Sequence, residues 1–206
     1  MKIRLKNRLL VLTAENEEEA RAAESWISTH ADHVFVVNAQ DQETFLLRDL
    51  GLRSEACREP IEVQSRSADE AVRLISNFAH TPFMLHGRQY ASVEGFWQGL
   101  KFVDETDRKR LAQLHGSEAK RAGQQAPEAE TFQYQGTRVR VGCYEHWELM
   151  SQACGAKFTQ HDAARHALLS TGTRPLTHRM RRDSRTIPGV IMADIWMNIR
   201  ARLEKG

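Results

Sequence analysis

The sequence predicts an α+β protein, in which a mainly helical domain with small β elements follows a small α/β N-terminal extension. Three observations predict this fold class. Strand and helix patterns alternate over the first 50 residues, a hairpin and six helical stretches follow, and the charge balance changes along the chain. Residues 1–73 hold 10 basic and 14 acidic residues, whereas residues 74–206 hold 19 basic and 13 acidic ones. We therefore expect an extension at 1–60 and a domain at 61–206, with any phosphate-bearing ligand on the second part.

The N-terminal part shows two strand patterns and two helix patterns. Residues 8–14 predict a strand, and residues 15–30 predict a helix with acidic residues in its first turn. Residues 33–38 predict a buried strand, and residues 41–50 predict a second helix that ends at Gly51. This part lacks a glycine-rich phosphate loop, so we expect an accessory layer or a surface for a partner.

The second part combines short strands with helices. A strand is expected near 61–65, and His86-Gly87 predicts the turn of a hairpin over 82–91. The polar segment 124–136, which contains a proline, is expected to be a loop. The expected helices are 92–104, 105–115, 117–123, 143–158, 161–170 and 190–204.

Composition excludes several classes of protein. With 41% hydrophobic and 27% charged residues, the 206-residue chain is neither a disordered tail, nor a collagen-like repeat, nor a disulfide scaffold. The apolar run at 9–12 is too short for a secretory signal or a membrane span. The three cysteines form no CxxC pair. These features predict a cytoplasmic protein without a metal site or a membrane partner.

The helix expected from Ser92 has three distinct faces. Small residues on one face, Ser92, Gly95 and Gly99, allow close approach by another backbone or a ligand. The apolar face is formed by Val93, Phe96, Trp97, Leu100 and Val103.

Glu94, Gln98 and Lys101 form a narrow polar stripe on the same helix, because they are spaced at i, i+4 and i+7. A solvated helix has a broader charged face, so we expect the stripe in a cleft or in the interior. The helix dipole favours an ionised Glu94, whereas burial raises the pKa of a carboxyl group. Glu94 is therefore a candidate base or cation stabiliser. The alternative is a structural pair between Glu94 and Lys101 in a packed core.

Several short motifs, taken in order, resemble the NADAR family of YbiA-type proteins, whose pattern opens with S-N-F, P-F, D-G and E-H-Y-F-Q-A-x-K-F. The matching residues are Ser76-Asn77-Phe78, Pro82-Phe83, Gly87 and residues 93–102. The likeness continues at residues 118–123, Lys157-Phe158, residues 168–172 and residues 200–203, and covers roughly residues 74–204. The order and spacing of these pieces, rather than any single one, make the resemblance specific.

The resemblance implies a helix-dominated α+β fold and an N-glycosidase, which cleaves the bond between ribose C1′ and a nitrogen. It implies as substrates phosphorylated ribosyl intermediates of riboflavin biosynthesis, or ADP-ribose on guanine in DNA, and no cofactor. Glu94 aligns with the catalytic glutamate and Asp183 with a second acidic residue. The substrate-binding candidates are Asn77, Phe78, Trp97, Gln98, Lys101, His178, Arg182 and Arg185.

The chain departs from the family pattern near Asp183. His178 replaces a usual glutamate, and the loop after Asp183 is shorter than in the family and lacks its tryptophan. His178 is therefore a candidate proton donor. The shortened loop also motivates the alternative function, a non-catalytic module that binds ADP-ribose or a nucleotide.

A cluster of arginines surrounds Asp183. Arginine suits bidentate phosphate contact, so the cluster can bind the pyrophosphate of an ADP-ribosyl ligand or a DNA backbone. The alternative is a solvated loop. The expected partners are thus a small phosphorylated ribosyl or ADP-ribosyl ligand and DNA. The cluster comprises Arg174, Arg179, Arg181, Arg182 and Arg185.

Overall fold

A computed structural model of the chain describes residues 2–6, 9–30, 33–39, 45–52, 59–179 and 186–205. The chain divides into two compact units, Met1–Arg58 and Glu59–Gly206. Compactness does not by itself establish independent folding, so the predicted domain boundary at residue 60 stays a prediction.

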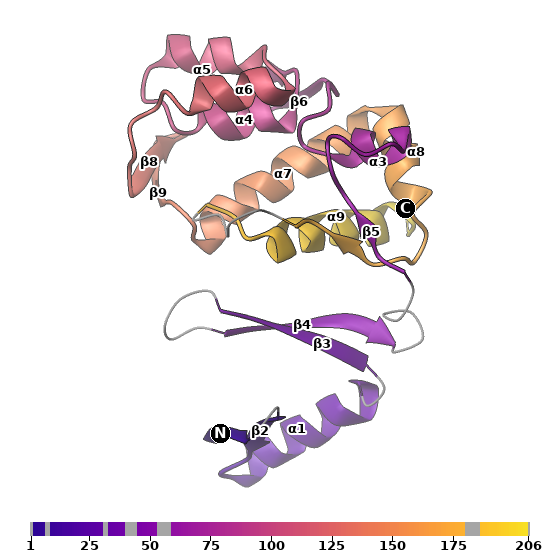
Figure 1. Cartoon of the computed structure of the whole chain (residues 1–206). Coiled ribbons are helices and arrows are strands. Elements are labelled where there is room, and N and C mark those ends of the chain that lie inside the picture. Colours follow the sequence, from indigo (N-terminus) through magenta and orange to yellow (C-terminus); the bar gives the residue numbers. More distant parts are fainter. Residues whose placement is uncertain are drawn as a thin grey trace. The chain divides into compact units, whose positions relative to one another are not determined.

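The described residues of the N-terminal unit form two antiparallel hairpins and one helix (Figure 1). In the first hairpin Lys2 lies opposite Thr13. The ring of Trp26 on the helix packs 4.9 Å from the ring of Phe35 on the second hairpin. The elements are β1 (Lys2–Lys6), β2 (Leu9–Thr13), α1 (Glu17–His30), β3 (His33–Ala39) and β4 (Phe45–Leu52). The predicted helix at 15–30 and the predicted strands at 8–14 and 33–38 are confirmed.

The helix predicted at 41–50 is wrong, because Phe45–Leu52 form strand β4. This strand pairs with β3, with Phe45 opposite Ala39 and Leu52 opposite His33. A short apolar run does not distinguish a helix from a strand by its periodicity. The pairing also satisfies backbone groups of β3 that would otherwise form an open edge.

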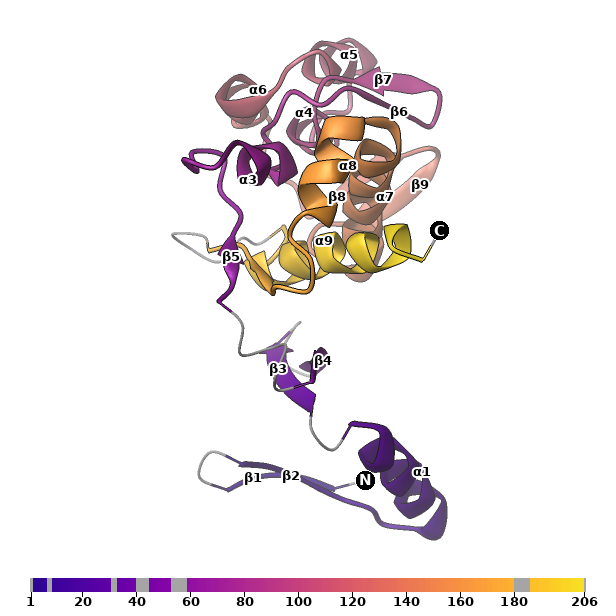
Figure 2. The ribbon, with the colours of Figure 1, turned by 90° about the vertical axis from the view of Figure 1, so that its right-hand side faces the viewer.

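The C-terminal unit is mainly helical, with small two-stranded sheets, which confirms the predicted fold class. Helices α4, α5 and α6 pack together, α7 packs against α8 and α9, and α4 also contacts α7 (Figures 1 and 2). Within the described ranges, no helix has both the length and the apolarity that crossing a membrane requires. The helices are α3 (Glu70–Ile75), α4 (Val93–Gly99), α5 (Glu105–Ala112), α6 (Gly116–Gly123), α7 (Tyr144–Gln160), α8 (Asp162–Leu169) and α9 (Gly189–Leu203).

The strands of this unit are short. The predicted turn at His86-Gly87 is confirmed, and both residues have positive φ, 48° and 77°, as a tight hairpin turn requires. The strand expected near 61–65 is confirmed as β5, which pairs in parallel with β10. The strands are β5 (Ile61–Glu62), β6 (Phe83–Leu85), β7 (Arg88–Tyr90), β8 (Thr131–Tyr134), β9 (Thr137–Arg140) and β10 (Leu176–Thr177).

Two expectations for this unit are wrong. The segment 124–136 is not all loop, because β8 pairs with β9 across Gln135-Gly136, both of which have positive φ. The helix from Ser92 does not reach residue 104, because α4 ends at Gly99 and leaves Val103 88% exposed. Asp104 instead caps α5 by accepting the amide of Thr106 at 2.7 Å, which turns the chain away.

Close approach of α4 to its neighbours depends on two glycines. A Cβ on Gly95 would lie 2.6 Å from the carbonyl oxygens of Leu111 and Leu114, so the small face of α4 meets backbone. A Cβ on Gly123, at the end of α6, would lie 1.9 Å from Gln98 Oε1. The separation of α4 and α6 is therefore set by the absence of a side chain at residue 123.

Gly123→Ala is expected to destabilise the protein by about 1–3 kcal/mol, because the added methyl group overlaps the buried Gln98 side chain. Gly155→Ala is the matched control, since a Cβ there meets nothing within 4 Å on helix α7. That change should be neutral or stabilising by up to about 1 kcal/mol. Urea unfolding of both variants measures the difference, and equal stabilities would contradict the proposed packing.

Candidate functional site

Glu94 lies in the first turn of α4, and the cap of that helix fixes its position. The Ser92 hydroxyl accepts the Gly95 amide at 2.9 Å and donates to the Leu114 carbonyl, also at 2.9 Å. The amide of Glu94 donates to the carbonyl of Asn77 at 2.9 Å. Two segments distant in sequence therefore hold the backbone that carries the carboxylate.

The Glu94 side chain is only 6% exposed. Its Oε1 atom accepts a hydrogen bond from Gln98 Nε2 at 2.7 Å and lies 3.8 Å from Lys120 Nζ. The other amide atom, Gln98 Oε1, is buried and finds no hydrogen-bond donor among the described residues. Because an ionised carboxylate can only accept, this orientation of Gln98 is the one that a charged Glu94 selects.

Opposing effects act on the charge of Glu94. Burial raises the pKa of this carboxyl group and is the largest effect. The Lys120 ammonium, the Gln98 hydrogen bond, Lys101 and His178 all oppose it by stabilising the ionised form. The structure thus confirms the interior location predicted for the Glu94–Gln98 part of the stripe, and it gathers positive charge around the carboxylate.

Lys101 does not form the structural pair that was the alternative for Glu94. Its Nζ atom donates to the Gly123 carbonyl at 3.5 Å, and the described ion pair of Glu94 is with Lys120. Burial and the nearby Lys120 lower the pKa of Lys101, while Glu94 raises it. Lys101 is therefore an electrostatic neighbour of Glu94 rather than its direct partner.

His178 lies just after β10 and close enough to Glu94 to influence its ionisation. A ring nitrogen, Nδ1, lies 3.0 Å from the Val63 carbonyl. Because a carbonyl only accepts, Nδ1 carries the proton. The edge-on contact with Trp196, at 5.4 Å between ring centroids, also fixes the imidazole.

Asn77 and Phe78 follow α3 but have different surroundings. The side-chain amide of Asn77 donates to the sulfur of Met192 at 3.1 Å, so its contact with Glu94 is through its backbone. Phe78 lines a separate groove together with His80 and His115. The structure therefore brings Glu94, Gln98, Lys101 and His178 together, whereas Phe78 faces a neighbouring hollow.

A buried lysine binds the backbone directly before Asn77. Lys157 on α7 is 0% exposed, and its ammonium donates to the carbonyls of Ile75 and Ser76 at 3.0 and 2.8 Å. These carbonyls lie at the C-terminal end of α3, where the helix dipole attracts a cation. Burial lowers the pKa of Lys157 to about 7.

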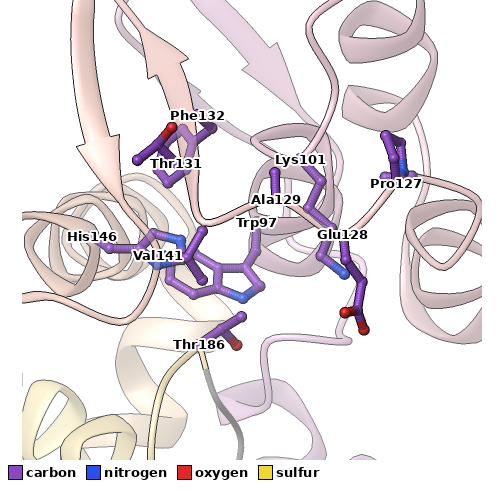
Figure 3. A pocket seen from close by; sticks show the side chains of 11 residues that line it. Trp97, Lys101, Pro127, Glu128, Ala129, Thr131, Phe132, Val141, His146 and Thr186 are labelled. Atoms are coloured by element: carbon purple, nitrogen blue, oxygen red, sulfur yellow. The ribbon is translucent and has the colours of Figure 1, made fainter. Parts of the chain in front are cut away.

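A pocket of about 190 Å³ adjoins the polar stripe (Figure 3). Trp97 and Lys101 contribute to its wall, and His146 of α7 stacks flat against Trp97 with the ring centroids 4.0 Å apart. The remaining wall is formed by Ala126, Pro127, Glu128, Ala129, Thr131, Phe132, Val141 and Thr186. The predicted binding residues Trp97 and Lys101 thus line this cavity, whereas Glu94 and Gln98 do not.

Three predicted site residues, Asp183, Arg182 and Arg185, lie outside the described residues. Within the described ranges, no three His, Cys, Asp or Glu side chains gather as a metal site requires. Sequence reasoning missed two neighbours of the site, Lys120 and His146. The motif at residues 118–123, which contains Lys120, could have indicated that lysine. Nothing in the sequence indicated that His146 stacks on Trp97.

The fold defines the class of protein, a helix-dominated α+β domain of the YbiA type. The NMR structure of the E. coli protein YbiA is similar over 74% of this chain and 90% of that one, with a TM-score of 0.52 and 22% identity. The resemblance to the NADAR family of YbiA-type proteins is therefore confirmed at the level of the fold.

The chain belongs to the family described as bacteriophage protein GP30.3, which matches residues 70–194. It is also similar to the uncharacterized 17.1 kDa protein in the Gp30-rIII intergenic region of Enterobacteria phage T4. The two are 38% identical over 56 residues, which is 27% of this chain and 37% of the phage protein. The alignment thus spans little more than a third of that relative.

Lys157→Met is expected to change how stability depends on pH. The pKa of Lys157 is about 7 in the folded protein against 10.5 for a free lysine, so the unfolded chain binds more protons between these values. The free energy of unfolding of the wild type should therefore rise by about 1.4 kcal/mol per pH unit, relative to the variant, from about pH 7.5 to about pH 10. Urea unfolding across this range measures the slope.

Lys109→Met, which removes an exposed lysine of α5, is the control and should keep the wild-type slope. Identical slopes for the wild type and Lys157→Met would show that Lys157 is not held in a low-dielectric site.

Proposed function

We propose that this chain is an N-glycosidase that hydrolyses the bond between ribose C1′ and a nitrogen in a phosphorylated ribosyl or ADP-ribosyl substrate. The candidate substrates are riboflavin-pathway intermediates and ADP-ribose attached to guanine in DNA. The observation that carries the proposal is Glu94, a buried carboxylate that accepts from Gln98 and lies beside Lys120. The YbiA-type fold and the motif resemblance support it.

Cleavage of a ribose–nitrogen bond places positive charge on the sugar as the bond breaks. A positioned carboxylate stabilises that charge and can take a proton from the attacking water. In this mechanism the water oxygen bonds to C1′, Glu94 receives the water proton, and the leaving nitrogen gains a proton. His178 and Asp183 are the candidate donors to that nitrogen, by analogy with paired acid and base groups in sugar hydrolysis.

The cations near Glu94 suit a substrate that carries phosphate. Lys120 is half exposed and Lys101 is half buried, so both ammonium groups can face a bound anion while they stabilise Glu94. The arginines near Asp183 are proposed to add phosphate or DNA-backbone contacts. A small phosphorylated ligand or ADP-ribose is thus the proposed partner, with DNA as the carrier of the latter.

Glu94→Gln is expected to lower the hydrolysis rate by about 100-fold or more, because the amide cannot take a proton or carry negative charge. The substrates are an oligonucleotide with ADP-ribosylated guanine and, in parallel, a phosphorylated ribosylamine. Mass spectrometry of the released sugar measures turnover. Glu148→Gln, an exposed glutamate of α7, is the control and should retain wild-type activity.

Each outcome separates the candidate functions. Release by the wild type and not by Glu94→Gln supports the glycosidase and identifies its substrate. Tight binding of ADP-ribose without any release favours the non-catalytic binding module instead. Full activity in Glu94→Gln would show that Glu94 does not take part in the reaction.

The rate should fall on acidification with a midpoint above 4.5, because burial raises the pKa of Glu94 and the reaction needs its ionised form. Lys120→Met should move this midpoint to higher pH, since the Lys120 ammonium lowers the pKa of Glu94. Lys120→Arg keeps the cation and should leave the midpoint near its wild-type value. Rate–pH profiles test this, and a midpoint unaffected by Lys120→Met would contradict it.

A further inference from the structure

The pocket lined by Trp97 and Lys101 has a size and lining that suit one planar ring. Its volume, about 190 Å³, is below the ~300–1,000 Å³ typical of sites that enclose a whole small molecule. Aromatic rings of Trp97, Phe132 and His146 form much of its wall (Figure 3). Flat apolar walls of this kind favour a flat ligand.

The protonation state of His146 follows from its contacts. The amide of Gly142 donates to Nδ1 at 3.1 Å, so Nδ1 carries no proton. Burial and the nearby Lys101 lower the pKa of His146 to about 4, so the ring is neutral at physiological pH. The single ring proton therefore lies on Nε2.

The described part of the chain offers no acceptor to this Nε2–H group. His146 is only 4% exposed, and its described contacts are the Gly142 hydrogen bond and the rings of Trp97 and Phe132. None of the described residues accepts from Nε2. This nitrogen is not one of the fully buried atoms without a partner, and His146 lines the pocket, so its proton is available to a ligand acceptor.

The second residue of the wall that carries a donor is Lys101. Its ammonium group makes only a long contact, 3.5 Å, to the Gly123 carbonyl. Lys101 and His146 therefore present donors that suit the oxygen or ring-nitrogen acceptors of a ring, and the Glu128 carboxylate lies in the same wall.

Helix α4 links the pocket to Glu94, since it carries both Glu94 and the lining residue Trp97. Trp97 follows Glu94 by three residues on α4, a rise of about 4.5 Å along the helix. A sugar attached to a ring that is bound against Trp97 would extend toward the turn of α4 that carries Glu94.

We propose that this pocket binds the planar heterocycle of the substrate, with His146 Nε2–H donating to a carbonyl oxygen or ring nitrogen of that heterocycle. The site rests on the proposed function for its link to the ribose at Glu94. Its ligand class is a heterocycle with in-plane acceptors, such as a purine or pyrimidine that bears a carbonyl group.

Binding of GMP, UMP and ribose 5-phosphate to the wild-type protein, measured by calorimetry, tests the proposal without any turnover. Both nucleotides should bind more tightly than ribose 5-phosphate, which lacks the ring. In saturation-transfer NMR the ring protons of GMP and UMP should receive the strongest transfer. Equal affinity for all three ligands, or strongest transfer to the sugar protons, would overturn the proposal.

His146→Phe keeps an aromatic ring but removes the donor, so it should weaken nucleotide binding about three- to tenfold. Its affinity for ribose 5-phosphate should not change. His146→Gln offers an amide donor near the Nε2 position and should recover part of the loss. The control is His166→Phe on α8, an exposed histidine outside the pocket, which should bind like the wild type.

An unchanged nucleotide affinity in a folded His146→Phe variant would also overturn the site. Should that variant fail to fold, the wild-type ligand series and the NMR transfer still decide the question. A protein that prefers nucleotides but hydrolyses neither test substrate would retain the ring site and refute the glycosidase. Hydrolysis of a test substrate, without a preference for nucleotides over ribose 5-phosphate, would support the glycosidase and refute the ring site.

Discussion

The candidate site depends on the hydrogen bonds that the buried ammonium of Lys157 donates to two backbone carbonyls. The accepting carbonyls, those of Ile75 and Ser76, lie at the C-terminal end of helix α3. The carbonyl of the next residue, Asn77, accepts a hydrogen bond from the amide of Glu94. Removing a charged amine from water is costly, and the carbonyls at the helix end and the Phe158 ring, 4.9 Å away, offset that cost. A single side chain of α7 thus orders the segment that holds the first turn of α4.

Glu94 shows how a protein can keep a carboxylate in its interior. Burial favours the neutral form, while Lys120, Lys101, His178 and the Gln98 amide favour the ionised form. These groups come from three different segments of the chain, so the balance exists only in the folded state. A carboxylate under such opposing effects has the properties expected of a group that accepts protons or stabilises a cation.

The sequence predicts most of the helices because their apolar periodicity is long and their caps are strong, as at Ser92 and Asp104. It fails where a short run fits two structures, as at 45–52, or where a polar hairpin has no apolar alternation, as at 131–140. Glu94 and Gln98 follow from one helix and are predictable. Lys120 is brought to Glu94 by the packing of α6, and His146 is brought to Trp97 by α7, contacts that no local pattern contains.

The tight contact between Gly123 and Gln98 has a consequence for the energetics of charge at this site. Because α4 and α6 meet without an intervening side chain, the backbones that carry Glu94 and Lys120 pack closely against each other. The local dipoles are thus oriented before any ligand arrives. A positive charge that develops beside Glu94 would meet a preorganised field, and little reorganisation free energy would be spent in turning the surroundings toward it.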